Sequence, residues 1–118
     1  MKSEKQMEVY KRDNLIADII FQHKGKENAI GIRELALALR EKGYKVQDDH
    51  IHIIVRKIIF DKRLPICSNV HYGYYWATNK KDIQFAIDEL RNKIGSLQER
   101  IELLESFIYE EKGDQENA

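Results

Sequence analysis

The sequence predicts a mainly α-helical chain with one small β-hairpin and a long C-terminal coiled-coil helix. Three segments before residue 63 have apolar residues at helical spacing. Two short β-rich segments follow Pro65, and an unbroken heptad pattern fills the chain after residue 80. The chain has 118 residues, which is the size of one domain, and 34% of them are charged. A charge fraction this high, together with a single proline, is typical of long helices.

The first two helices are predicted from their apolar stripes and from the glycines that follow them. A helix is expected over residues 4–23, and Gly25 is expected to end it. Residues 29–31 are expected to form a short extended piece. A second helix is expected over residues 32–42, and Gly43 follows it at the position where a glycine commonly ends a helix.

A third helix is expected from about residue 49 to residue 62. Asp48 is predicted to be its N-cap, and Asp49 adds negative charge at the positive end of the helix. The apolar stripes of the three helices and the hairpin are expected to share one small core. The predicted core residues are Ile16, Ile20, Leu35, Leu39, Ile51, Val55, Ile58, Ile66 and Trp76.

Pro65 ends the third helix, because proline lacks the backbone N–H that a continuing helix needs. Residues 66–68 and 74–77 are two β-rich segments, and the turn between them contains a glycine. We therefore predict a β-hairpin in which Cys67 is a half-buried strand residue.

A long fourth helix is predicted over residues 80–110, capped by Thr78 or Asn79. Its aliphatic residues follow gaps of four and three, which makes a heptad seam with isoleucine at position a and mostly leucine at position d. The predicted dimerisation residues are Ile83, Ile87, Leu90, Ile94, Leu97, Ile101, Leu104 and Ile108. An exposed row of large aliphatic side chains exceeds what soluble monomers usually present, so we expect a homodimer. The alternative is an amphipathic helix that covers its own domain.

The seam leaves the orientation of the two helices open. Isoleucine at a with leucine at d favours two parallel strands, and Arg100 at g with Glu105 at the next e′ would form an interchain ion pair. Antiparallel pairing is the alternative.

Three regions are expected: a folded domain over residues 1–78, a coiled-coil dimerisation helix over 79–111 and a frayed polar tail over 112–118.

The charges are unevenly distributed along the chain. Lys+Arg and Asp+Glu are both 20, so the formal net charge is zero. Residues 30–80 nevertheless contain nine basic and five acidic residues, a net charge of +4, whereas residues 81–118 carry −5. The middle of the chain is therefore the part that suits a phosphate backbone.

The order of these elements, ending in LPICSNVHYGYYWA at residues 64–77, resembles the winged helix-turn-helix family of DNA-binding domains. The likeness is greatest to the N-terminal domain of biotin repressors and to small phage- and prophage-encoded proteins. It covers about residues 30–77. The resemblance implies a third helix that reads the major groove and a hairpin, the wing, that contacts the DNA backbone.

The resemblance implies a set of basic and polar residues on these elements as contacts to double-stranded DNA. They are Arg33, His50, Arg56, Lys57, Lys62, Arg63, Asn69, His71 and Tyr72. The chain departs from the pattern at Ile53 and Phe60, which are apolar on the face of the third helix that should be polar. The alternative is therefore an adaptor in which this face binds a partner protein.

Other classes of function find little support in the sequence. No catalytic motif is present, the spacing of His50, His52, Cys67 and His71 matches no common zinc pattern, and no cofactor motif is present. We expect a chain that is not an enzyme and binds no metal.

The sequence also predicts where the protein is located. The single cysteine fits a reducing compartment. Neither a signal peptide nor a long apolar run indicates a membrane, so we expect a cytoplasmic protein. The predicted function is a dimeric DNA-binding protein, either a transcriptional regulator or a phage or prophage replication accessory.

Overall fold

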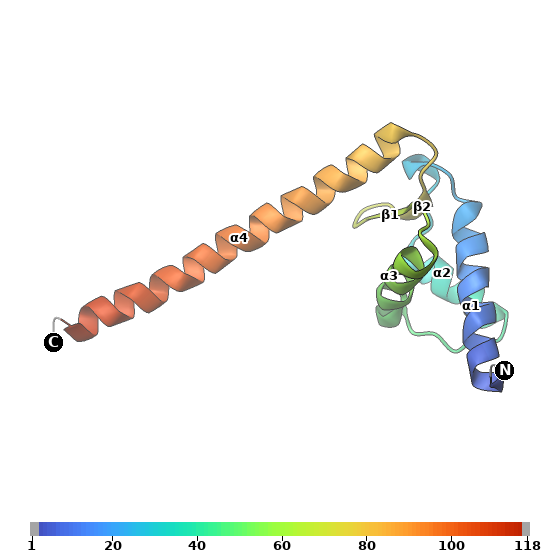
Figure 1. The fold of residues 1–118 in the computed structure, drawn as a ribbon, viewed down its shortest axis with the longest axis horizontal. Helices are drawn as coiled ribbons and strands as arrows, with labels where there is room; N and C mark the ends of the chain where they lie inside the picture. Colours follow the sequence, from blue (N-terminus) through green and yellow to red (C-terminus); the bar gives the residue numbers. More distant parts are fainter. Residues whose placement is uncertain (1–2, 117–118) are drawn as a thin grey trace. The chain divides into compact units, whose positions relative to one another are not determined.

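The computed structural model describes the backbone of residues 3–116 and the side chains of residues 3–110. Its helices, its one antiparallel hairpin and its long C-terminal helix confirm the predicted fold class (Figure 1). The chain forms two compact units, Met1–Ala86 and Ile87–Ala118. Within the described residues, none of the helices combines the length and the apolar character needed to cross a membrane.

Helix α1 spans Glu4–Phe21 and begins with a capping box, in which Ser3 and Gln6 exchange hydrogen bonds between side chain and backbone. Its end was predicted too late, at residue 23. The chain leaves the helix earlier because His23 and Gly25 form backbone hydrogen bonds with Trp76, at 2.8 and 3.0 Å. Gly25 does not end α1 either, since it precedes the short 3-10 helix η1, Lys26–Asn28.

Helix α2, Ile32–Glu41, ends one residue before the predicted boundary and is followed by Gly43 as expected. Gly43 has φ +93°, and its N–H donates to the carbonyl of Arg40 at 2.9 Å. The N–H of Tyr44 donates to the carbonyl of Leu39 at 3.0 Å. These two bonds form a Schellman motif, which satisfies carbonyl groups that the last helical turn leaves open.

Helix α3, Ile51–Lys62, follows a second 3-10 helix, η2, over Asp48–His50. The prediction that Asp48 is the N-cap is wrong, because no side-chain cap bond is made at the start of η2 or of α3. The Asp48 carboxylate instead accepts a hydrogen bond from Arg40. At its other end, α3 stops at Arg63, which adopts the left-handed conformation.

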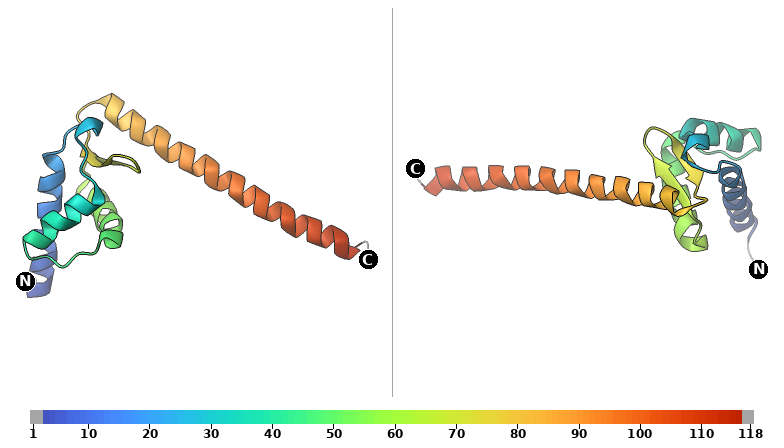
Figure 2. Two further views of the ribbon diagram at one scale, coloured as in Figure 1. Left: turned by 180° about the vertical axis from the view of Figure 1, so that it is seen from behind. Right: turned by 90° about the horizontal axis from the view of Figure 1, so that it is seen from above.

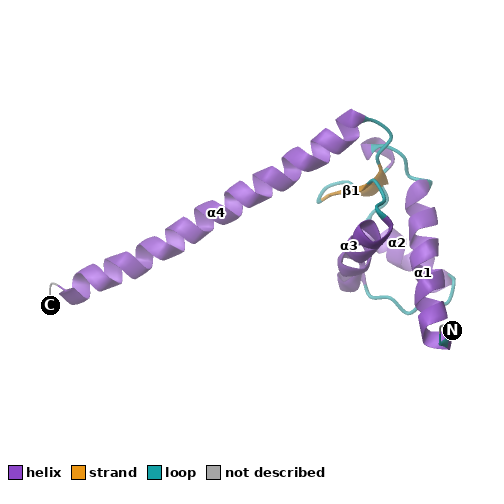
Figure 3. Cartoon of the chain, in the orientation of Figure 1, coloured by secondary structure: helices purple, strands orange, loops and turns teal. Residues whose placement is uncertain are grey.

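Strands β1, Ile66–Asn69, and β2, Gly73–Trp76, pair antiparallel in the predicted hairpin. The extended piece before α2 pairs with β2 through one isolated antiparallel bridge, because Ile30 and Tyr74 exchange two backbone hydrogen bonds of 2.8 Å. Figure 3 shows the strands as a small patch beside the helices. Strand β2 therefore forms backbone hydrogen bonds with residues before η1, His23 and Gly25, and with Ile30 after it.

One hydrophobic core joins the three helices to the hairpin. Figure 2 shows the arrangement of these elements from two further sides. Every predicted core residue belongs to it, with Trp76 at its half-buried edge. The buried members are Ile16, Ile20, Ile30, Leu35, Ala36, Leu39, Val46, Ile51, Val55, Ile58, Ile66 and Tyr74. A smaller cluster of Cys67, Tyr75 and Ala77 lies on the other side of the strands and makes Cys67 more buried than expected.

Helix α4 spans Lys80–Glu116, so it is longer than the predicted 80–110. The Asn79 side chain caps it by accepting from the N–H of Asp82 at 2.9 Å, which selects Asn79 from the two predicted caps. The predicted frayed tail, 112–118, is helical to Glu116, and its last two residues lie outside the described residues.

Candidate nucleic-acid interface

Helix α3 divides into a buried face and an exposed face. Ile51, Val55 and Ile58 are at most 1% exposed because they lie on the stripe that faces the shared core. The opposite face of α3 lies in solvent and includes the residues expected to read bases. Its exposed members are His52, Ile53, Arg56, Lys57 and Phe60. The helix therefore presents cations and large apolar groups together.

Arg56 and Phe60 are neighbours on this face, one helical turn apart. The guanidinium carbon of Arg56 lies 5.7 Å from the centre of the Phe60 ring, within the range of a cation–π contact. Phe60 is 70% exposed and Ile53 is 58% exposed. Arg56 is itself exposed, so its charge stays accessible, and the contact with the Phe60 ring restricts where the guanidinium points.

The acidic start of η2 bears on whether this face can approach phosphate. Arg40 donates to the Asp48 carboxylate at 2.5 Å and, through Nε, to the carbonyl of Val46 at 2.9 Å. Arg40 therefore neutralises one of the two adjacent aspartates and links the end of α2 to the segment before α3. Asp49 is exposed, so the second carboxylate stands in solvent beside His50.

The cations at the C-terminal end of α3 have different environments. The Lys62 ammonium donates to the Asn14 side chain and lies 5.5 Å from the ring centre of Tyr10, so it joins α3 to α1. Arg63 is exposed and has φ +52°, the only positive φ among the described non-glycine residues. Arg63 is thus the freer of the two predicted phosphate contacts.

The hairpin turn places two of its three predicted contact residues in solvent. His71 and Tyr72 are exposed. Asn69 is 8% exposed, and its side-chain oxygen accepts the backbone N–H groups of His71 at 2.8 Å and Tyr72 at 3.3 Å. Asn69 therefore shapes the turn, and its buried side chain is not part of the exposed surface.

Two further lysines lie beside aromatic rings: Lys26 at the hairpin turn and the start of α4, and Lys24 next to α1 and the end of β2. The Lys26 ammonium is 5.5 Å from the ring centre of Tyr72 and 4.1 Å from that of Phe85. The Lys24 ammonium is 4.1 Å from the Phe21 ring centre, and Phe21 packs edge-on against Trp76 at 5.0 Å. Both lysines precede residue 30, so they lie outside the basic segment of residues 30–80.

The remaining predicted contacts stand at the starts of helices. Arg33 lies in the first turn of α2 and is exposed. His50 is the residue that precedes α3, and it is exposed too. Each is open to a ligand, and His50 adjoins the exposed face of α3.

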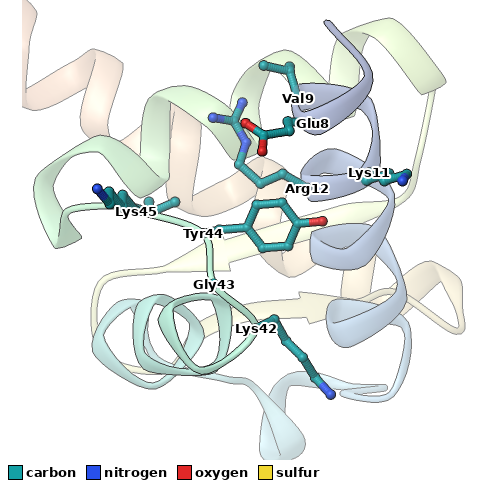
Figure 4. A pocket seen from close by; sticks show the side chains of 9 residues that line it. Glu8, Val9, Lys11, Arg12, Lys42, Gly43, Tyr44 and Lys45 are labelled. Atoms are coloured by element: carbon teal, nitrogen blue, oxygen red, sulfur yellow. The ribbon is translucent and has the colours of Figure 1, made fainter. Parts of the chain in front are cut away.

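A separate groove of 630 Å³ lies between α1 and the connection from Lys42 to Val46. Figure 4 shows the Tyr44 ring extending from this connection toward α1. Four cations and one carboxylate line the groove: Lys11, Arg12, Lys42, Lys45 and Glu8. The Arg12 guanidinium is already paired with Asp13 at 3.1 Å. The groove shares no lining residue with α3 or with the hairpin turn.

The only cysteine is no exposed nucleophile. Burial raises the pKa of the Cys67 thiol above its ordinary value, against a hydrogen bond from Tyr75 that lowers it. Among the described residues, no group of three His, Cys, Asp or Glu side chains is placed to hold a metal ion.

The apolar seam of α4 is open along its length in the single chain. All eight predicted dimerisation residues are exposed, from 36% at Ile87 to 66% at Ile94. Three further large apolar residues near the C-terminal end of the helix are exposed as well: Leu103, Phe107 and Tyr109.

No protein-family model matches this chain, and no curated protein and no solved structure matches it.

Proposed function

We propose that the chain is a dimeric DNA-binding protein of the winged-helix type, in which α3 enters the major groove and the β1–β2 hairpin is the wing. The observation that carries the proposal is the exposed face of α3, where Arg56 and Lys57 stand in solvent on a helix anchored by its opposite face. A rigid helix with exposed basic side chains is the usual reader of base edges in this class of domain.

The residues around α3 have complementary roles in this proposal. Arg56 is the candidate for guanine, since a guanidinium can donate two parallel hydrogen bonds to O6 and N7. Arg63 and Arg33 supply phosphate contacts, and His71 and Tyr72 reach the backbone from the wing. Lys26 adds a cation beside Tyr72.

Dimerisation through the seam of α4 would compensate for the modest charge of one domain. Two weakly binding domains that are linked act on neighbouring half-sites with a raised effective concentration. A chain of zero net charge therefore suits DNA better as a pair than as a single copy. Transcriptional regulation and phage or prophage replication are two roles that such a dimer fits.

Fluorescence anisotropy with labelled duplexes at several salt concentrations tests the proposal. Arg56→Ala combined with Lys57→Ala should weaken binding by about tenfold or more and lower the salt slope by about 1 to 2. Lys11→Ala combined with Lys42→Ala removes the same charge from the separate groove and serves as the matched control. Equal loss in both double variants, or no binding of any duplex at low salt, would refute the assignment of α3.

A second candidate function is an adaptor that binds a partner protein through α3. It is favoured by the exposure of Ile53 and Phe60, which are unusual on a base-reading face. Ile53→Asp should abolish capture of such a partner, and it should also weaken any DNA binding, because the new carboxylate lies on the face that carries Arg56. Ile53→Ser removes the apolar group without adding that charge, so it should weaken capture and leave DNA binding through Arg56 largely intact. If Ile53→Asp and Phe60→Asp have no effect on captured proteins, this candidate fails.

A further inference from the structure

The two edges of the α4 seam carry different charges. In heptad terms, Lys93 and Arg100 occupy position g on one edge, and Arg91, Gln98 and Glu105 occupy position e on the other. All five side chains are exposed in the single chain. Flanking charges of this kind determine which orientation two helices adopt.

We propose that α4 pairs with α4 of a second copy in parallel and in register; this rests on the dimer in the proposed function and adds its orientation. In a parallel pair, each g residue faces the e residue of the other helix five positions further on. Arg100 then faces Glu105 of the second copy, and the twofold axis repeats this attraction. Lys93 faces Gln98, which is neutral.

Antiparallel pairing places like charges together. Alignment of the eight seam residues in that orientation sets Ile94 against Leu97 and brings Lys93 beside Arg100 of the other copy. This repulsion also occurs twice, because the arrangement is symmetric. The edge formed by position e offers no opposite charges in return, since Arg91 meets Gln98. The charges therefore disfavour the antiparallel pair.

Orientation decides where the two DNA-binding domains lie. The first turns of α4 belong to the unit Met1–Ala86. The seam from Ile83 to Ile108 spans about 37 Å at a rise of 1.5 Å per residue. Parallel pairing brings both copies of this unit to one end of the paired helices, and antiparallel pairing separates them by that length.

A charge reversal at Arg100 distinguishes the orientations by the sign of its effect. The neighbours of Arg100 at three and four residues are uncharged: Ser96, Leu97, Leu103 and Leu104. Arg100→Glu therefore acts chiefly between chains. Sedimentation equilibrium of the full chain should show a dimer Kd raised roughly tenfold, and Arg100→Glu with Glu105→Arg should restore it. A tighter dimer for Arg100→Glu would overturn the proposal, because only an antiparallel pair gains an attraction to Lys93.

Disulfide exchange gives a second readout that does not depend on charge. Ile87→Cys and Leu104→Cys, each in a Cys67→Ala background, are mixed in a glutathione buffer, with one variant carrying a mass tag. Parallel pairing yields only 87–87 and 104–104 disulfides. A predominance of the mixed 87–104 disulfide, or no disulfide at all, contradicts it. DNA binding is measured separately, so a parallel dimer that binds no duplex would refute the proposed function and leave this inference standing.

Discussion

Gly73 lies directly against the backbone of Ile30. A Cβ atom at position 73 would be 2.1 Å from the carbonyl oxygen of Ile30 and 2.7 Å from its carbonyl carbon. Gly73 also has φ +97°, a conformation that side chains disfavour. The close approach permits the two hydrogen bonds between Ile30 and Tyr74, which join the segment before α2 to the hairpin.

Gly73→Ala should therefore be strongly destabilising. We expect the free energy of unfolding to fall by about 3 kcal/mol, from backbone strain and the clash with Ile30 together. Gly43→Ala is the matched control, because Gly43 also has a positive φ but no atom within 4 Å of a Cβ. It should cost only about 1 kcal/mol. Equal losses for the two variants in urea unfolding would show that the clash has no cost.

Gly95→Ala should have the opposite sign. Gly95 lies inside α4, on the side away from the seam, and a Cβ there meets no atom within 4 Å. Alanine lowers the conformational entropy of the unfolded chain, so α4 should gain about 0.5–1 kcal/mol. Thermal unfolding followed by circular dichroism at 222 nm measures this gain, and an unchanged or lower midpoint contradicts it.

Leu97→Asp should dissociate the proposed dimer while the unit Met1–Ala86 stays folded. A carboxylate in the centre of the seam would be buried without a partner, at a cost of several kcal/mol. Ser96→Asp introduces the same charge one residue away, outside the seam, and should leave the dimer intact. Light scattering reports the mass, and near-ultraviolet circular dichroism of Trp76 reports the folded unit. A Leu97→Asp dimer as stable as the parent would exclude the seam as the interface.

The sequence predicted what local periodicity determines. The buried stripe of α3, the glycine at the end of α2 and the two strands of the hairpin all follow from patterns within about ten residues. Contacts between distant segments were missed. The early end of α1 depends on pairing with Trp76, and the role of Asp48 depends on Arg40. No local pattern encodes either partner.

In the candidate site, too, the sequence predicts local features but not contacts between distant segments. Exposure of Arg56 and Lys57 follows from the helical wheel, and both are exposed. The turn-shaping role of Asn69 is also local, because its side chain accepts from residues two and three positions further on. The neighbours of Lys26, however, come from the hairpin turn and from α4, so only the three-dimensional structure brings them together.

Stability should decrease in alkaline solution because two buried acids resist ionisation. Burial raises the pKa of the Cys67 thiol above its ordinary value of 9.0 and that of the Tyr74 phenol above 10.0. In the unfolded chain both groups lose their protons at those ordinary values. The folded state then holds more protons than the unfolded state, so the free energy of unfolding falls as pH rises. The loss begins near pH 9 for Cys67 and near pH 10 for Tyr74.

Two variants separate this effect from the general titration of lysines in the same range. Cys67→Ala should abolish the part of the decline that begins near pH 9, and Tyr74→Phe should abolish the part that begins near pH 10. Both variants keep most of the buried apolar surface. The informative quantity is the slope of the free energy of unfolding against pH, rather than the free energy at pH 7, because only the slope reports the protons released on unfolding. Urea unfolding from pH 7 to 10.5 provides that slope. Parallel curves for the parent chain and both variants would mean that neither group is protected by burial, because a protected acid must change the number of protons released on unfolding.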